Sequence, residues 1–278
     1  MRGEKRRSRN LFGSRDGPRD FPIPFKHGDR WMGVPKPARA APAARAARPA
    51  APSGLILAAG FGSRLGHDMP KALIAWGAKG KTILDHQLER LAEAGVAETW
   101  VVIGFQAERI RAHLKGRSGV HFVENKKYMD TNTAKSMLLG LKAIPAGGVV
   151  TLNGDVVFDG GIIGLLTGKA DTTSLAVDPR VCGDEEIKYR VRDGRLQALN
   201  KQTHGEGEAV GINFIAAQDR DLLMTALAYA EDQSYFERGI ESMLPYTKRR
   251  VRCVAIGDRR AMEIDFPEDL EAARRLFE

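Results

Sequence analysis

From residue 54 onward, short apolar runs alternate with stretches of helical length, and this alternation restricts the fold more than any other feature. The runs TWVVIGF (99–105) and GVVTLNGD (148–155) are almost continuously apolar until their last residues, as is typical of strands covered on both faces. Strands that alternate with helices predict a mainly parallel sheet with helices on both sides.

The first half of this region predicts strands at 55–59, 99–103, 120–123 and 148–152, and helices at 82–94, 106–115, 133–143 and 160–167. Beyond residue 171 the apolar pattern predicts strands at 172–177, 186–192, 195–200, 209–215 and 249–255, with Asp193-Gly194 as a hairpin turn, and helices at 217–230 and 267–277. We therefore expect a three-layer α/β fold with a mixed, mainly parallel sheet, whose second half adds an antiparallel part that faces the substrate.

Residues 1–53 differ from the rest in charge. They hold 13 Lys and Arg against four Asp and Glu, whereas residues 54–278 hold 30 against 31, so the net charge of +8 belongs to the leader. This Arg-, Pro- and Ala-rich stretch has no helical or strand period, which predicts disorder. There are two alternatives: upstream sequence added by an early start codon, or a transit peptide. The four acids of the leader disfavour the transit peptide. One near-neutral domain over 54–278, with no basic face for nucleic acid, is the expectation.

No apolar stretch approaches the roughly 18 residues that span a bilayer, and the N-terminus lacks the apolar core of a secretory signal. Cys182 and Cys253 lack metal-ligand spacing, which favours two reduced thiols that pack as small hydrophobic groups. We expect a cytoplasmic protein that does not bind membranes; whether it forms a homo-oligomer is left open.

A glycine loop follows the first strand in the segment LILAAGFGSRLGHDMPKAL (55–73). Gly60 and Gly62 allow the backbone to turn and bring its N–H groups against an anion. Arg64 and Lys71 add two cations that can neutralise the phosphates of a nucleoside triphosphate. The segment therefore indicates a nucleotide site.

Two other phosphate-binding loops fit less well. A P-loop is excluded because GxxxxGK[ST] does not occur in the chain. A dinucleotide-binding loop would need an acid at the end of the second strand, and that strand ends in Ile103-Gly104-Phe105.

Two aspartates follow strands that should end at the same edge of the sheet. Asp155 comes directly after the apolar run 148–152, and Asp265 ends the short run Glu263-Ile264-Asp265 before a helix that begins with Pro267. Ligands of open α/β sheets bind at this edge, and carboxylate oxygens are ligands that Mg²⁺ prefers. The sequence predicts that Asp155 and Asp265 hold Mg²⁺, with a turn aspartate and a helix N-cap as the alternative interpretations.

The set AAGFGSRLG…PKAL, LNGD and EIDFPEDL resembles the nucleotidyltransferase superfamily of sugar-phosphate and alcohol-phosphate pyrophosphorylases, with the MobA-like NTP transferase fold, over residues 54–278. The segments 125–136, 184–188, 200–201 and 207–212 resemble its phosphocholine, aminoethylphosphonate and inositol-phosphate cytidylyltransferases. The resemblance implies a nucleotide-diphospho-sugar transferase (GT-A-like) fold. A related glycosyltransferase would need a D-x-D motif, but residues 155–157 read Asp-Val-Val.

The resemblance also implies which residues bind the nucleotide. Arg64 would contact the leaving phosphates and Lys71 the α-phosphate, and both would act in catalysis with the metal ligands Asp155 and Asp265. The remaining nucleotide-binding residues would be Leu57, Ala58, Ala59, Gly60 and Gly62 around the triphosphate, and Thr131, Asn132 and Ser136 near base and ribose.

For the acceptor, the resemblance implies that Lys201 binds its phosphate and that Glu185, Glu186 and Glu208 face its head group. If the acceptor carries an ammonium group, these acids would pair with it. The acceptor oxygen is already anionic at neutral pH, so the reaction needs neither a protein nucleophile nor a general base.

The sequence thus favours an Mg²⁺-dependent nucleotidyltransferase that couples an NTP, by preference CTP, to a small phosphorylated or phosphonylated alcohol, amine or sugar and releases pyrophosphate. Three alternatives stay open: a sugar-1-phosphate uridylyl- or guanylyl-type transferase, a catalytically inactive nucleotide-sensing module, and a nucleic-acid binder that acts through the leader.

Overall fold

The computed structural model describes residues 51–61, 68–77, 80–180, 183, 186–247 and 249–277, and the backbone of two short strands at 24–27 and 30–33. Contacts divide the chain into two units, residues 1–44 and 45–278. In the first unit, β1 (Pro24–His27) and β2 (Arg30–Gly33) pair as an antiparallel hairpin, within the range for which composition predicts disorder. Among the described residues, none of the helices combines the length and the apolar character that crossing a bilayer requires.

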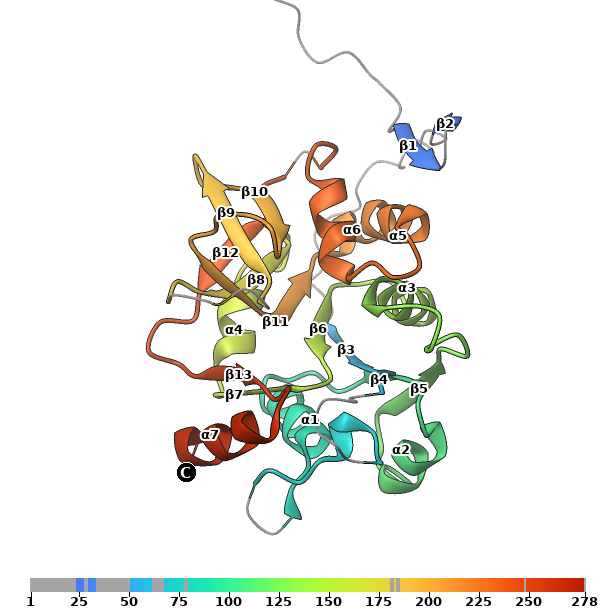
Figure 1. The fold of residues 1–278 in the computed structure, drawn as a ribbon, viewed down its shortest axis with the longest axis vertical. Coiled ribbons are helices and arrows are strands. Elements are labelled where there is room, and N and C mark those ends of the chain that lie inside the picture. The colour runs from blue at the N-terminus through green and yellow to red at the C-terminus, as the bar shows by residue number, and fades with distance from the viewer. Residues whose placement is uncertain are drawn as a thin grey trace, which may run out of the picture. The chain divides into compact units, whose positions relative to one another are not determined.

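Four parallel strands form the centre of the second unit (Figure 1). β3 (Ser53–Ala58) lies between β4 (Thr99–Ile103) and β6 (Val149–Asn153), and β5 (Val120–Glu124) pairs with the outer side of β4. Their parallel direction brings the carboxyl ends of β3 and β6 side by side, with Leu57 opposite Asn153 in the register.

An antiparallel part continues the sheet beyond β6. β11 (Gly207–Ile215) pairs with β6 and also with β9 (Lys188–Arg192), which forms a hairpin with β10 (Arg195–Asn200). β8 (Ser174–Asp178) pairs antiparallel with β11 and parallel with β12 (Arg252–Ala255). The sheet is therefore mixed, as the change of pattern after residue 171 predicts.

Helices cover both faces of the sheet. α1 (Ile83–Glu93), α2 (Ala107–His113) and α4 (Ile162–Thr167) share one hydrophobic cluster. A second cluster, on the other face, contains α3 (Thr133–Ala143) and, after the short 3-10 helix η4 (Ala217–Asp219), α5 (Arg220–Tyr229) and α6 (Phe236–Met243).

The strand side chains explain why two cores form. Along β3, Ile56 and Ala58 belong to the first cluster, whereas Leu55 and Leu57 belong to the second. Successive side chains of a strand point to opposite faces, so an apolar run without polar interruptions supplies both layers at once.

A two-stranded antiparallel sheet places the last segment of the chain beside the end of the main sheet. β7 (Val156–Phe158) pairs with β13 (Ala261–Glu263), and the backbone N–H of Ile264 donates to the carbonyl of Asp155 at 3.0 Å. α7 (Pro267–Phe277) follows and buries Ala273 in a third cluster. This pairing brings the ends of β6 and β13 together.

Most predicted elements are confirmed to within about three residues: for example, 99–103 is β4, 133–143 is α3 and 195–200 is β10. The hairpin turn has positive φ at both Asp193 (53°) and Gly194 (66°), as a type I′ turn requires. The sequence did not predict β7 or α6, and the short strand that it predicts at 263–265 lies two residues earlier, as β13. In α6, Phe236, Ile240 and Met243 have helical spacing, but Gly239 lowers helix propensity.

Gly154 is required where the end of β6 crosses the end of β3. Its N–H donates to the carbonyl of Leu57 at 3.1 Å. A Cβ at this position would lie 2.4 Å from that same carbonyl oxygen and 3.0 Å from Cα of Ala58. Both neighbours are backbone atoms, so neither can move aside cheaply.

We therefore predict that Gly154→Ala lowers the free energy of unfolding by roughly 2 kcal/mol, the usual cost of an overpacked site. The control is Gly164→Ala in α4, where an added Cβ meets nothing within 4 Å and alanine favours a helix. Urea denaturation of both variants tests this. Equal stability of Gly154→Ala and wild type would contradict the crossing described here.

Candidate active site

A cavity of about 370 Å³ opens at the carboxyl ends of β3 and β6. Most of the predicted site residues lie on its wall: Leu57, Ala58, Gly60, Lys71, Asn132, Asp155, Lys201, Glu208 and Asp265. The sequence did not select Asn153, Tyr235, Glu237 or Glu263, which also line it. The cavity therefore unites residues from β3, β6, β11, α3, α6 and the segment after β13.

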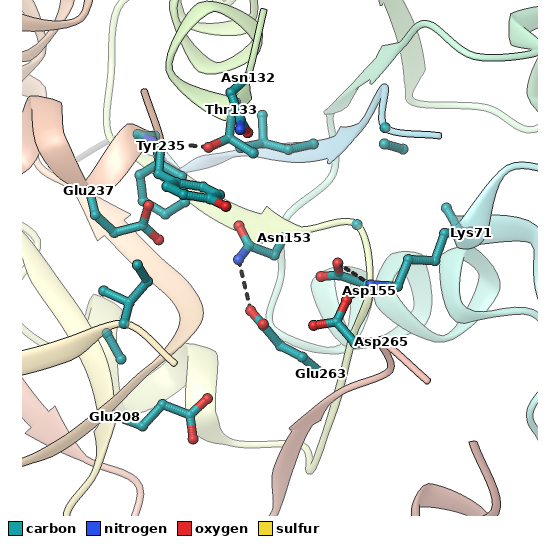
Figure 2. A pocket seen from close by; sticks show the side chains of 18 of the residues that line it. Lys71, Asn132, Thr133, Asn153, Asp155, Glu208, Tyr235, Glu237, Glu263 and Asp265 are labelled. Carbon is teal, nitrogen blue, oxygen red and sulfur yellow. Dashed lines mark hydrogen bonds and ion pairs between the residues drawn. The ribbon is translucent and has the colours of Figure 1, made fainter. Parts of the chain in front are cut away.

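One end of the cavity holds an ammonium group between two carboxylates (Figure 2). Nζ of Lys71 lies 2.7 Å from Oδ2 of Asp155 and 2.5 Å from Oδ1 of Asp265. Lys71 belongs to the short 3-10 helix η2 (Lys71–Leu73), Asp155 follows β6, and Asp265 follows β13. The two predicted metal ligands are therefore adjacent, and both lie beside Lys71 and the beginning of the glycine loop.

The Lys71 ammonium is held strongly in its charged form. Burial alone would lower the pKa of this amine, because its side chain is only 12% exposed. The attraction of Asp155 and the hydrogen bonds to both aspartates outweigh burial and raise the pKa above its ordinary value. Lys71 is thus a permanent cation at physiological pH.

The pair of aspartates fits a magnesium ion that takes further ligands from phosphate and water. Oδ1 of Asp155 is buried and has no hydrogen-bond partner, which leaves a lone pair for a cation. Within the described residues no group of three or more His, Cys, Asp or Glu side chains forms a closed metal cage. A site with one or two carboxylates is what Mg²⁺ uses in phosphate-binding enzymes.

Three glutamates form an acidic wall that extends from beside the aspartates to the other end of the cavity: Glu263 on β13, Glu208 on β11 and Glu237 on α6. Burial, with repulsion from Glu186 and Asp178, raises the pKa of Glu208 to about 7. Burial likewise raises the pKa of Glu237 to about 7.

Glu263 is the member of the acidic wall nearest to the aspartates, and burial and the charge of Asp155 raise its pKa well above the ordinary range. Its Oε1 accepts a hydrogen bond from Nδ2 of Asn153 at 2.9 Å. Asn153 thereby holds the carboxyl at the edge of β6.

One cation faces the acidic wall from the cavity lining. Nζ of Lys201 lies 5.3 Å from the centroid of the Tyr235 ring, in cation–π geometry. Lys201 follows β10, and Tyr235 comes directly before α6. An anion bound at Lys201 would therefore have carboxyl groups close to it.

The predicted base and ribose contacts divide into two groups. Asn132 lines the cavity, and its Oδ1 accepts from the N–H of Thr133 at 2.7 Å as the N-cap of α3. The hydroxyls of Thr131 and Ser136 each accept from Nδ2 of Asn125 at 3.0 Å, and neither residue lines the cavity. These two hydroxyls brace the loop before α3.

Other predicted residues lie elsewhere. The side chain of Ala59 is buried, and its carbonyl accepts from the N–H of Phe105 at 3.1 Å. Glu186 lies behind Glu208 and has one buried oxygen without a partner. Gly62, Arg64 and Glu185 lie outside the described residues. So does Cys182, whereas Cys253 is a free thiol whose pKa burial raises to about 12.

A signal for one of the missed residues was present in the sequence. Glu263 precedes Asp265 by two positions, and alternate residues of an extended chain point the same way, so both could have been assigned to one site. Glu237 and Tyr235 carried no such signal, because α6 itself was not predicted.

We predict that Glu237→Gln stabilises the protein increasingly as pH rises from 4.5 to 7, and most at and above pH 7. The pKa of Glu237 is raised from 4.5 to about 7, so the native state retains a proton that the unfolded chain loses as pH rises from 4.5 to 7. Its contribution to the free energy of unfolding therefore falls over this interval, by up to about 3 kcal/mol.

Urea denaturation at pH 5 and pH 8 tests this, with the exposed Glu271→Gln as control. The Glu237 variant should gain stability at pH 8 and little at pH 5, whereas the control should change at neither. An equal gain at both pH values would rule out a buried, titrating carboxyl.

Comparison with known proteins identifies the family of this chain. A family model described as a MobA-like NTP transferase domain matches residues 54–208. The CTP:phosphoglutamine cytidylyltransferase of Campylobacter jejuni is 25% identical over 253 residues, covering 79% of this chain and 98% of that protein. The CMP-5′-(3-aminopropyl)phosphonate synthase of Streptomyces rubellomurinus is 34% identical over 128 residues, covering 44% of this chain and 20% of that protein.

Shorter matches and a solved structure complete the comparison. The bifunctional protein GlmU of Synechococcus elongatus is 36% identical over 101 residues, which are 36% of this chain but only 22% of that protein. The CTP:phosphocholine cytidylyltransferase LicC of Streptococcus pneumoniae superposes with a TM-score of 0.66 at 18% identity, covering 81% of this chain and 99% of the other. This structural likeness confirms the fold.

Proposed function

The chain belongs to the family of MobA-like NTP transferase domains, and we propose that it transfers a nucleotidyl group from a nucleoside triphosphate to a small phosphorylated or phosphonylated acceptor, with Mg²⁺, and releases pyrophosphate. The observation that carries this proposal is the contact of Lys71 with Asp155 and Asp265 in the cavity that Gly60 also lines. A cation and two acids beside a glycine loop suit a triphosphate and its metal.

In the proposed reaction an anionic oxygen of the acceptor attacks the α-phosphorus in line with the departing pyrophosphate. Two anions must approach each other, so the protein's task is to position them and to neutralise charge. Lys71 would bind the α-phosphate oxygens. Asp155 and Asp265 would hold Mg²⁺, and the bound ion would supply positive charge to offset the charge that develops on the phosphates.

Further contacts of the nucleotide are part of the same proposal. Leu57 and Ala58 at the end of β3, together with Gly60 just after it, would lie along the triphosphate. Arg64 would bind the leaving phosphates. Asn132 would face the nucleoside, since it lines the cavity at the start of α3.

For the acceptor, we propose that Lys201 binds its phosphate or phosphonate and that the acidic wall of Glu208, Glu237 and Glu263 binds an ammonium group. A cationic head group would offset the burial, and the smaller repulsion from nearby acids, that raise the pKa of Glu208 and that of Glu237 to about 7. The names of the relatives support an acceptor that contains nitrogen, since they include phosphocholine and (3-aminopropyl)phosphonate.

CTP is the proposed nucleotide, because the CTP:phosphoglutamine cytidylyltransferase that matches 79% of this chain is named for CTP. A uridylyl or guanylyl transferase that acts on a sugar 1-phosphate is the second candidate, and the 36% identity with GlmU over 101 residues favours it. A nucleotide-sensing module without activity is the third.

Pyrophosphate release separates these candidates. Each of CTP, UTP, GTP and ATP is combined with phosphocholine, aminoalkyl phosphates and phosphonates, and sugar 1-phosphates in the presence of Mg²⁺. We expect release with CTP and an amine-bearing acceptor. Release only with UTP or GTP and a sugar 1-phosphate would establish the second candidate, and silence with every pair would refute the enzyme.

We predict that Lys71→Ala and Asp155→Ala each lower kcat about 100-fold or more, the usual cost of removing one stabilising group from a transition state. The control is Glu98→Gln. It removes an exposed charge at the start of β4, at the opposite edge of the sheet from the cavity. Thermal melts verify folding. Wild-type turnover in either site variant would contradict the assigned roles.

We predict that Glu208→Gln raises KM for an aminoalkyl phosphate about tenfold, because a lost ionic hydrogen bond costs about 1.5 kcal/mol or more, and leaves KM for CTP unchanged. The wild-type KM for this acceptor should fall as pH rises through 7, where Glu208 ionises. Glycerol phosphate, which has no amine, is the control acceptor. An equal rise in KM for both acceptors would show that Glu208 does not recognise the amine.

A further inference from the structure

The two carboxylates that suit a metal ion already have a cation between them. Lys71 reaches Asp155 and Asp265 with one nitrogen, at 2.7 and 2.5 Å, and Figure 2 shows its side chain extended from η2 toward both carboxyl groups. One ammonium group thus binds both acids and offsets one of their two negative charges.

We propose that the Lys71 ammonium substitutes for the metal. It binds both aspartates in the free protein, and it leaves them only when the phosphates of a nucleotide attract it. Metal and nucleotide then bind together, and neither occupies the site well alone. This inference rests on the proposed function, because it takes the cavity to be a nucleotide site.

Two cations compete for the same oxygens. A divalent ion held by both aspartates needs Asp265, and Oδ1 of Asp265 accepts from the Lys71 ammonium. The unpartnered Oδ1 of Asp155 remains, but an ion there would stand a few ångströms from a full positive charge. At such separations like charges repel strongly in a partly buried site. The ammonium must therefore move before the metal can use both acids.

The side chain can move while the backbone stays in place. The carbonyl of Lys71 accepts from the N–H of Ile74 at 3.0 Å within η2, and the following Ala72 and Leu73 are buried. A lysine has four rotatable carbon–carbon bonds and a compact charge. It can exchange the aspartates for another anion without a loop rearrangement.

A nucleotide supplies the other anion. Lys71 with two aspartates has a net charge of −1, and a divalent ion added alone turns this to +1 without a new partner for the ammonium. A triphosphate offers that partner and adds oxygens for the metal. By thermodynamic reciprocity, the nucleotide raises the affinity for metal by the same factor by which the metal raises the affinity for nucleotide.

The test measures Mn²⁺ binding to the nucleotide-free protein by electron paramagnetic resonance. Mn²⁺ prefers the same oxygen ligands as Mg²⁺ and binds more tightly. We expect weak binding by wild type and at least about tenfold tighter binding by Lys71→Met, which keeps the length of the side chain and removes its charge. Lys71→Arg retains the charge and should bind as weakly as wild type. Lys71→Gln is a second neutral variant if Lys71→Met does not fold.

Three results would overturn the inference: wild type that binds Mn²⁺ as tightly as Lys71→Met, neutral variants that bind no better than wild type, or tight binding by Lys71→Met that survives the additional substitution Asp265→Asn. Pyrophosphate release by wild type is measured separately. If wild type releases no pyrophosphate in any assay, the proposed reaction is refuted, but the Mn²⁺ result still stands. Failure of the proposed reaction can therefore be told apart from failure of this inference.

Discussion

The attraction between the Lys71 ammonium and the carboxylates of Asp155 and Asp265 joins three segments that are remote in the chain, with sequence separations of 84 and 194 residues. Each segment reaches this point for its own reason. Gly154 lets the end of β6 cross β3, the pairing of β13 with β7 returns the last segment, and η2 presents Lys71. The fold is thus the means by which opposite charges meet at one edge of a sheet.

The two ends of the cavity differ in how their charge is balanced. Around Lys71 each carboxylate has a cationic partner, whereas at the acidic wall burial, with repulsion from nearby acids, raises the pKa of Glu208 and that of Glu237 to about 7. Under the proposed function, this asymmetry would set the direction of the substrates, with phosphates near Lys71 and a positive group near the glutamates.

Much of this arrangement could be predicted from the sequence, because the informative residues follow apolar strands. Asp155 could be assigned since parallel strands end at one edge, and Lys71 because it is a cation that follows the glycine loop; both lie in the cavity. Thr131 and Ser136 are polar and close to that edge, yet Asn125 engages both. Glu237 could not be found, since Gly239 lowers the helix propensity of α6 and its close packing against Leu227, which leaves no room for a Cβ, is visible only in the structure.

The central claim is that one triphosphate and one metal ion share this edge of the sheet. A crystal structure with Mn²⁺ and a non-hydrolysable CTP analogue, recorded with anomalous diffraction, tests it most directly. The account predicts one Mn²⁺ peak in contact with both Asp155 and Asp265, with the Lys71 ammonium on phosphate oxygens. A peak remote from either aspartate, or Lys71 still placed between the two carboxylates, would contradict it.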